Sequence, residues 1–259
     1  MAEHDTKPTD LGKNRTGVQA NPIMTKEMLD NSSAVPSNPQ GAMAIATVRA
    51  EHSKEAPPVG TMPVPGNVKG MAKTAMKALQ GEKASVFLDK LGERLAFERT
   101  GTRIYDAIVA KLPASSTGKD PFPPDELRRF RDEEHAHFLL CKEAMEQMGG
   151  DPTAVTPCAD VAGVASEGIV KVVTDPRTTL TQCLDALLIA ELTDNDGWKT
   201  LITMAEAIGQ DDLARRFTDA LAEEDVHLQT IREWLAKRLE GQLGAKMPSA
   251  EFGEPASPT

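Results

Sequence analysis

The sequence predicts an all-α protein whose main domain is a four-helix bundle with one long crossover between its second and third helices. Aromatic residues make up only 4% of the chain, while alanine, leucine, methionine and charged residues dominate. This composition is typical of helices that pack through aliphatic side chains. Hydrophobic residues recur every three or four positions in four long segments. The connection from Gly150 to Arg177 is much longer than the other two.

The bundle is expected to occupy residues 85–240, with weaker elements on both sides. Residues 1–66 contain eight of the 18 prolines and only scattered hydrophobic residues, so we expect an extended or disordered tail that builds no core. Residues 67–84 place small hydrophobic side chains at helical spacing, which predicts a short amphipathic helix. Residues 241–259 are expected to form a frayed C-terminal tail.

Local signals mark the ends of the four bundle helices. Their approximate ranges are 85–112, 124–149, 178–208 and 211–240. A proline-rich stretch separates the first two helices, and Asp125 and Glu126 favour the dipole at the start of the second. Gly149 and Gly209 are expected to end the second and third helices. Within the crossover, residues 160–173 predict a further short helix.

Each bundle helix carries ionisable residues in the middle of an otherwise hydrophobic stripe. In chain order these residues are Glu98, Glu134, His137, Glu191, Asp194, Glu224 and His227. A buried carboxylate is expensive in free energy unless it is neutralised, paired or bound to a metal. We find no lysine or arginine on the stripes near these positions. Divalent cations are therefore the expected counter-charge.

Two E-x-x-H motifs indicate the kind of metal. Glu134 and His137 form the first and Glu224 and His227 the second, and residues three apart on a helix project from the same face. With one glutamate from each of the other two helices, they match the carboxylate-bridged arrangement of di-iron and di-manganese proteins. Mixed oxygen and nitrogen ligands suit these metals better than calcium or structural zinc. We expect two iron ions per chain, with manganese as an alternative at one or both positions.

The four segments resemble the metal-binding helices of the ferritin-like superfamily, including bacterioferritin and rubrerythrin. The stretches that carry the resemblance are LAFERTGTRIYDAI, RDEEHAHF, LLIAELTDNDGW and LAEEDVHLQTI. The resemblance implies that Glu134 and either Glu191 or Glu224 are among the bridging carboxylates, and we expect the bridges between the two metals to be Glu134 and Glu224. Glu98 and Glu191 would then be terminal ligands, and each histidine would bind one metal. We take these six ligands, together with Tyr105, as the candidate catalytic residues.

The resemblance also implies roles for residues beside the ligands. Tyr105 matches the tyrosine next to the metals in bacterioferritin and rubrerythrin, with a plain core tyrosine as the alternative. Glu133 and Glu223 stand where related proteins place an acid that orients the histidine of the opposite helix, with solvated surface glutamates as the alternative. Asp194 matches an extra carboxylate of rubrerythrins and is either a metal ligand or a hydrogen-bonding neighbour. His135 lies off the stripe, has no assigned role and is expected to be a surface histidine.

Two features depart from particular members of that superfamily. The three cysteines, Cys141, Cys158 and Cys183, cannot supply the two C-x-x-C pairs of a full rubrerythrin, and we expect them to be small hydrophobic residues rather than a disulfide framework. The end of the chain does not look like the short fifth helix of cage-forming ferritins. The signature thus identifies the site better than the reaction.

The preferred functional hypothesis is an oxidoreductase whose metals react with O2 or H2O2, in the manner of a ferroxidase or peroxidase. The alternatives are an iron-handling or storage protein, a di-iron oxygenase with an organic substrate, and a bundle that metals merely stabilise. The net charge of −10 without a large basic surface argues against nucleic acid. The lack of a long apolar run or a leader-like start argues for a cytoplasmic protein without a membrane span. We expect a homo-oligomer, and the electron donor is unknown.

Overall fold

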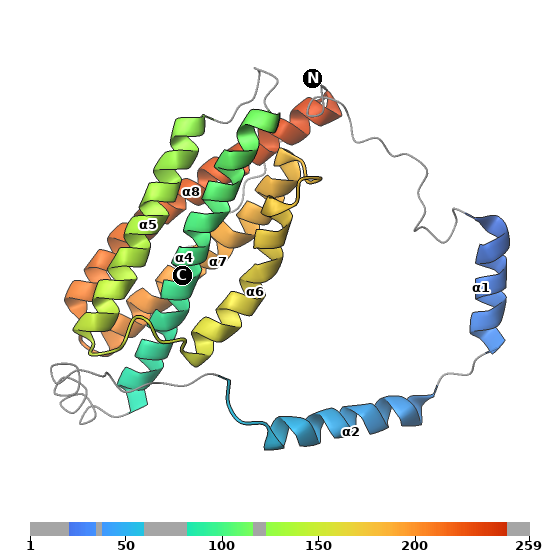
Figure 1. Ribbon diagram of the computed structural model, residues 1–259, viewed down its shortest axis with the longest axis horizontal. Coiled ribbons are helices and arrows are strands. Elements are labelled where there is room, and N and C mark those ends of the chain that lie inside the picture. The colour runs from blue at the N-terminus through green and yellow to red at the C-terminus, as the bar shows by residue number, and fades with distance from the viewer. Residues whose placement is uncertain (1–20, 35–37, 60–81, 116–122, 248–259) are drawn as a thin grey trace, which may run out of the picture. The chain divides into compact units, whose positions relative to one another are not determined.

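All regular elements in the described part of the chain are α-helices, which confirms the predicted all-helical class at this level. The computed structural model describes residues 21–34, 38–59, 82–115 and 123–247. Among these residues, those up to Pro58 belong to one unit and those from Val59 onward to another. Figure 1 shows the helices of both units.

The first unit contains α1 (Pro22–Ala34) and α2 (Pro39–Glu55), where we expected an extended or disordered tail. The side chain of Asn38 accepts a hydrogen bond from the backbone N–H of Gly41, and a proline occupies the first helical position of α2. Both features favour a helix start, and α2 has no buried residues. Local capping rather than a core therefore accounts for α2. The amphipathic helix predicted at 67–84 lies outside the described residues, except for its last three positions, which belong to α4.

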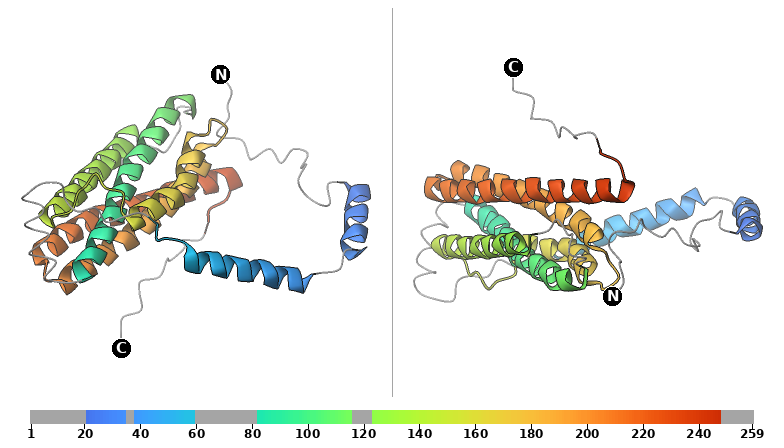
Figure 2. Two further views of the ribbon diagram at one scale, coloured as in Figure 1. Left: turned by 60° about the horizontal axis from the view of Figure 1, so that its bottom comes forward. Right: turned by 90° about the horizontal axis from the view of Figure 1, so that it is seen from above.

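In its described residues, the second unit has five helices that follow the predicted segments. They are α4 (Glu82–Ser115), α5 (Pro124–Gln147), α6 (Pro157–Thr174), α7 (Leu180–Ala207) and α8 (Asp211–Leu243). Helix α4 packs against α5, α6 and α7, and α8 packs against α7 and α5. Figures 1 and 2 show α4, α5, α7 and α8 running alongside one another, with α6 next to α4.

Most helix ends agree with the local signals in the sequence, but α4 continues through Pro113 to Ser115 instead of ending at about residue 112. Helix α5 begins with a proline and has two acidic residues in its first turn. Helix α7 begins with a capping box between Thr179 and Gln182, which satisfies two backbone N–H groups. The turns after α5 and α7 use Gly149 and Gly209, whose φ angles are 78° and 70°. These are left-handed conformations that favour glycine.

Helix α6 confirms the short helix that we predicted inside the crossover. It begins at Pro157, three positions earlier than expected, because Thr156 caps it by accepting a hydrogen bond from the backbone N–H of Ala159. The Thr156 hydroxyl also donates to the backbone oxygen of Asp89 on α4 over 3.1 Å. This hydrogen bond connects the start of the crossover helix to α4, the first helix of the bundle.

Two hydrophobic clusters form the core of this unit, and the predicted ionisable residues separate them along each helix. One cluster includes Leu91, Met145, Trp198 and Phe217. The other includes Ile104, Phe130, Leu187 and Ile231. In α4 and α8, residues of the cluster with Trp198 come first, followed by the ionisable residues and then by residues of the cluster with Phe130. In α5 and α7 the order is reversed. Consequently, α4 and α8 run in one direction and α5 and α7 in the other.

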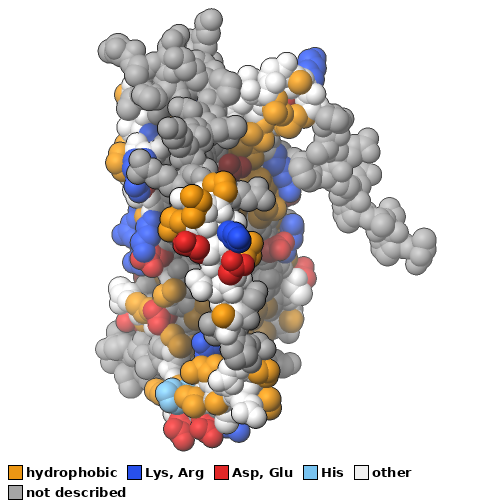
Figure 3. All heavy atoms as spheres, turned by 90° about the vertical axis from the view of Figure 1, so that its right-hand side faces the viewer, with side chains coloured by type: hydrophobic (Ala, Val, Ile, Leu, Met, Phe, Trp, Pro, Cys, Tyr) orange, Lys and Arg blue, Asp and Glu red, His pale blue; other side chains and the backbone are white. Residues whose placement is uncertain are grey.

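The surface of the described residues mixes side chains of every kind. On the face drawn in Figure 3, acidic, basic and hydrophobic side chains are interspersed. Hydrophobic residues such as Met43 and Val164 are exposed, and scattered exposure of this kind is normal in globular proteins. Within the described ranges, no helix combines the length and the apolarity that crossing a bilayer requires.

Candidate metal centre

The seven ionisable residues that we singled out on the helix stripes are all buried in the second unit. None of them is more than 3% exposed. They are Glu98 on α4, Glu134 and His137 on α5, Glu191 and Asp194 on α7, and Glu224 and His227 on α8. Because each helix contributes at the same level between the two hydrophobic clusters, the side chains meet in the interior.

Their ligand atoms form three overlapping groups, within each of which the atoms lie no more than 4.8 Å apart. The groups are Glu134, Glu191, Glu224 and His227; Glu98, His137 and Glu224; and Glu98, Glu134, Asp194 and Glu224. Glu224 belongs to all three. Its Oε1 lies 2.7 Å from Nδ1 of His137 and its Oε2 lies 3.2 Å from Nδ1 of His227. A single carboxylate thus faces both histidines.

Many potential ligand atoms of this cluster lack a well-aligned hydrogen bond. The buried atoms concerned are both oxygens of Glu98 and of Glu224, Oε2 of Glu134 and of Glu191, Oδ1 of Asp194, and Nδ1 of His137 and of His227. Buried polar atoms in proteins are normally satisfied. A convergent set of carboxylate oxygens and imidazole nitrogens is also what iron or manganese binds. The residues present therefore fit a metal site.

Each histidine of the cluster is held by a glutamate from the opposite helix. Nε2 of His137 on α5 lies 2.8 Å from Oε2 of Glu223 on α8, and Nε2 of His227 on α8 lies 2.7 Å from Oε2 of Glu133 on α5. Because an ionised carboxylate can only accept, the imidazole donates from Nε2 and turns Nδ1 toward the cluster. These contacts confirm the expectation that Glu133 and Glu223 orient the histidine of the opposite helix.

The electrostatics of the cluster show how the buried charges balance one another. Burial, followed by the negative charge of neighbouring carboxylates, raises the pKa of three glutamates well above the usual range: Glu98, Glu134 and Glu191. Burial acts on Glu224 in the same direction, but its contacts with the histidines lower its pKa to about 2. Although burial disfavours a charged imidazole, contacts with glutamates raise the pKa of His137 to about 9 and that of His227 to about 10. A metal ion that binds here must displace protons.

Aromatic side chains enclose the cluster. Tyr105 is fully buried, and its hydroxyl donates to Oε1 of Glu191 over 2.5 Å. The ring centroid of Phe130 lies 4.1 Å from that of His227, and the centroid of Trp198 lies 5.5 Å from that of His137. Tyr105 is therefore a core residue that also bonds to a predicted ligand.

The expectation that no lysine or arginine lies near these acids is wrong. Arg94 on α4 is only 4% exposed, and its Nε lies 2.7 Å from Oε1 of Glu98. Its Nη1 lies 3.3 Å from Oδ1 of Asp194 and donates to the backbone oxygen of Asp194 over 3.2 Å. A signal existed in the sequence, since Arg94 follows Leu91 by three positions and precedes Glu98 by four. Such spacing places it on the same helix face.

Two glycines inside helices make room for these buried charges, and no pattern in the sequence singles them out. A Cβ atom on Gly101 of α4 would overlap Oε2 of Glu134, and one on Gly197 of α7 would overlap Nη1 of Arg94. Glycine in a helix interior costs about 1 kcal/mol relative to alanine. The close approach of a functional side chain explains why glycine occupies both positions.

Comparisons of the chain with models of protein families, with curated proteins and with solved structures found no match. What the structure establishes is a predominantly helical chain with a buried cluster of acidic residues and histidines that could hold a metal ion. The resemblance to the ferritin-like superfamily therefore depends on the residues and the geometry of the site.

Proposed function

We propose that this chain is a ferritin-like protein that binds two metal ions, primarily iron, and acts as an oxidoreductase toward O2 or H2O2. The observation that carries this proposal is the reciprocal pair of contacts that joins His137 to Glu223 and His227 to Glu133. Each contact fixes an imidazole whose other nitrogen faces a cluster of buried glutamates. Metal-binding histidines are commonly oriented by carboxylates in this way.

The course of the chain supports the ferritin-like part of the proposal. Helices α4 and α8 run in one direction and α5 and α7 in the other, and the connection between α5 and α7 contains the crossover helix α6. A four-helix bundle with one long crossover is the connectivity of ferritin-like folds. Two of its helices contribute E-x-x-H motifs and the other two contribute single glutamates, as in the dinuclear carboxylate proteins.

The overlap between the groups supports a specific ligand assignment. Glu224 is shared by all three groups, so it is the first proposed bridging ligand. Glu98 and Glu134 are each shared by two groups, and we assign the second bridge to Glu134 because, like Glu224, it belongs to an E-x-x-H motif. Glu98 and the histidine of α5 would complete the ligands of one metal. Glu191 and the histidine of α8 would complete those of the other. Asp194 also lies within reach, but it is paired with Arg94.

The chemistry of the proposed reaction would come from the metals, and the chain would position them. Bound by these residues as a reduced pair, iron would supply electrons to O2 or H2O2. Tyr105 fixes the orientation of Glu191 through its hydrogen bond. Trp198 and Phe130 pack against the histidine rings and exclude bulk water from the cluster. The near-complete burial of the site favours small oxidants over large organic substrates.

Anaerobic titration with ferrous iron, followed by exposure to O2 or H2O2, tests the proposal. The wild type should bind two ions per chain, and the loaded protein should consume an oxidant faster than free iron does. His137→Ala should abolish both properties, whereas His135→Ala is the matched control, because His135 is exposed on the same helix. Failure of the wild type to bind two ions, or equal losses in the two variants, would refute the site. Binding without accelerated oxidant consumption would refute the oxidoreductase.

A further inference from the structure

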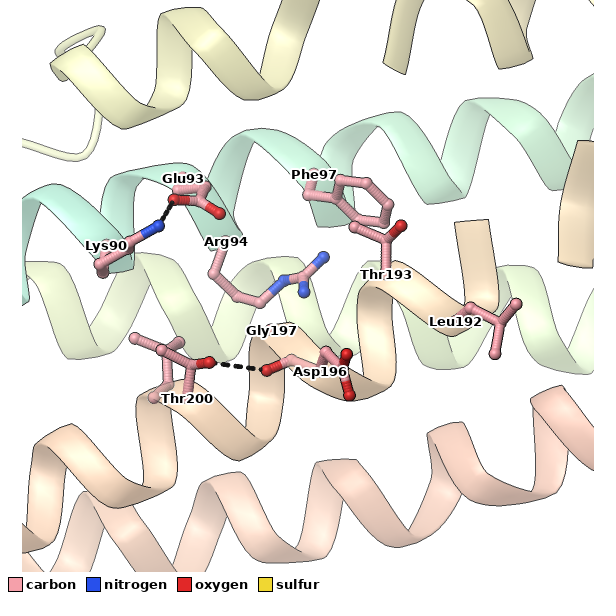
Figure 4. Close-up of a pocket in the computed structure, with 10 residues that line it drawn as sticks. Lys90, Glu93, Arg94, Phe97, Leu192, Thr193, Asp196, Gly197 and Thr200 are labelled. Atoms are coloured by element: carbon pink, nitrogen blue, oxygen red, sulfur yellow. Dashed lines mark hydrogen bonds and ion pairs between the residues drawn. The ribbon is translucent and has the colours of Figure 1, made fainter. Parts of the chain in front are cut away.

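A permanent positive charge lies within the acidic cluster, and the proposed two-metal site does not by itself explain it. Figure 4 shows Arg94 extending from α4 toward Gly197 on α7. The guanidinium carbon lies 4.4 Å from the ring centroid of Phe97, a distance at which a cation is attracted to an aromatic face. Its nitrogen atoms contact Glu98 on the same helix and Asp194 on α7.

Arg94 also forms a boundary of the cluster. A pocket of about 400 Å³ lies between α4 and α7, and its lining includes Lys90, Glu93, Arg94 and Asp196 but none of the predicted metal ligands. The guanidinium thus stands between the pocket and the carboxylates that it contacts. Its place there depends on Gly197, since a side chain at that position would overlap Nη1.

The number of buried charges indicates that Arg94 compensates one of the carboxylates. The buried carboxylates of the cluster are those of Glu98, Glu134, Glu191, Asp194 and Glu224. When all five are ionised, two divalent cations compensate four of the negative charges and the guanidinium compensates the fifth. An unpaired charge in the interior would be strongly destabilising. Arg94 contacts Glu98 over 2.7 Å and the carboxylate of Asp194 over 3.3 Å, and it also donates to the backbone oxygen of Asp194. Because Glu98 belongs to two of the candidate ligand groups and Asp194 to only one, Asp194 is the carboxylate whose charge is left for the guanidinium to compensate.

We propose that Arg94 is a positioning residue, a fixed internal cation that neutralises Asp194 and holds Glu98 in place beside the metal ions. On this assignment Asp194 is the counter-ion of Arg94, and the ions are bound by the four glutamates and two histidines. The inference rests on the proposed two-metal site. It replaces the hypothesis that Asp194 is itself a ligand.

A double-mutant cycle measures the pairing directly. We expect Arg94→Gln and Asp194→Asn each to lower the melting temperature of the metal-free protein by several degrees, because each leaves a buried charge without its partner. The double variant should be more stable than the sum of the two losses predicts. Each single variant should bind ferrous iron about 10- to 100-fold more weakly. The double variant should still bind two ions per chain, although more weakly than the wild type, because Glu98 loses the contact that holds it in place.

The double variant separates this proposal from the alternatives. If it binds fewer than two ions while the wild type binds two, Asp194 is a ligand and the proposal is wrong. Additive losses in melting temperature would likewise show that the pair is not coupled. If the wild type binds no metal, the proposed function fails, but the cycle in the metal-free protein still decides the pairing.

A second perturbation covers the case in which Arg94→Gln does not fold. Gly197→Ala displaces the guanidinium without changing any charge, so it should weaken iron binding, and its matched control is Gly168→Ala, where an added Cβ meets no atom within 4 Å. Arg94→Lys, which keeps the charge, should retain two ions per chain. Unchanged iron affinity in Gly197→Ala, or loss of an ion in Arg94→Lys, would contradict the role of a fixed cation.

Discussion

Glu133 on α5 accepts a hydrogen bond from Nε2 of His227 on α8 over 2.7 Å. The mirror contact joins Glu223 on α8 to His137 on α5. Each E-x-x-H helix therefore carries one additional glutamate, directly before its motif, that serves the histidine of the other helix. This reciprocal arrangement couples the orientation of both imidazoles to the packing of α5 against α8.

Replacing these outer glutamates should weaken metal binding while leaving the ligands in place. We expect Glu133→Gln and Glu223→Gln each to reduce the affinity for ferrous iron about 10- to 100-fold, as is typical for residues that orient metal ligands. Anaerobic competition with a chelating dye measures the affinity. Asp132→Asn is a suitable control because its side chain is 67% exposed beside Glu133. An equal loss in the control would indicate a general charge effect.

Much of this arrangement could be predicted from the sequence because helical periodicity and buried charge are both local signals. The positions of α4, α5, α7 and α8 follow from their hydrophobic stripes, and Glu98 and Glu191 stand out because an acid in a stripe is costly. Helix α6 followed from the residues of the crossover. The tail was predicted less well, because α2 is capped locally by Asn38 and has no buried residue that a stripe could reveal.

The features of the site that could not be predicted from the sequence depend on contacts between helices. Arg94 has the spacing of an interior residue, but its burial depends on an acid and a glycine on α7, about one hundred positions away in the chain. The periodicity of α4 therefore cannot predict that Arg94 pairs with Asp194. Likewise, the sequence of α4 alone shows only that Gly101 lowers helix propensity. The reason for a glycine at this position is the side chain of Glu134 on α5, which occupies the space that a Cβ would fill.

The two classes of proposed ligand should respond differently to substitution. Glu224 faces both histidines, so Glu224→Gln should abolish binding of both iron ions. Glu98→Gln should leave one ion per chain, because Glu98 is proposed to serve a single metal. Metal analysis after anaerobic loading gives the stoichiometry, with circular dichroism as a check on folding. Glu206→Gln, at an exposed position of α7, is the control, and equal stoichiometry for Glu224→Gln and Glu98→Gln would show that the bridge assignment is wrong.

Gly101 offers a test of the site that alters no charge. A Cβ at this position would overlap Oε2 of Glu134, so Gly101→Ala should displace that carboxylate and reduce iron stoichiometry or affinity. Alanine is intrinsically better than glycine in a helix by about 1 kcal/mol, so loss of binding could not be attributed to helix propensity. Gly168→Ala, in open space on α6, should bind iron as the wild type does. Normal binding in Gly101→Ala would mean that Glu134 is not required as a ligand in its present position.

The raised pKa values of the histidines predict opposite pH dependence for the metal-free and metal-bound protein. Contacts with glutamates outweigh burial and raise the pKa of His137 to about 9 and that of His227 to about 10. A group whose pKa is higher in the folded state contributes stability that is complete below its unfolded pKa and is lost as the pH rises through its folded pKa. Asp194, whose pKa burial raises to about 7, has the same sign. The metal-free protein should therefore lose stability from about pH 4, where the contribution of Asp194 begins to fall, and should continue to lose it above about pH 6.5 as the contributions of the histidines fall.

Metal binding reverses this trend because the ligands must give up their protons to the solvent. The increase in melting temperature caused by manganous ion, which needs no exclusion of oxygen at neutral pH, should therefore grow between about pH 6.5 and 8. Titration in weakly buffered solution should also show proton release. His135→Ala should keep this pH dependence because His135 is exposed, whereas Glu224→Gln should lose it together with the metal. A metal effect that is constant or declines with rising pH would show that His137 and His227 do not exchange their protons for the ion, and that the cation binds elsewhere.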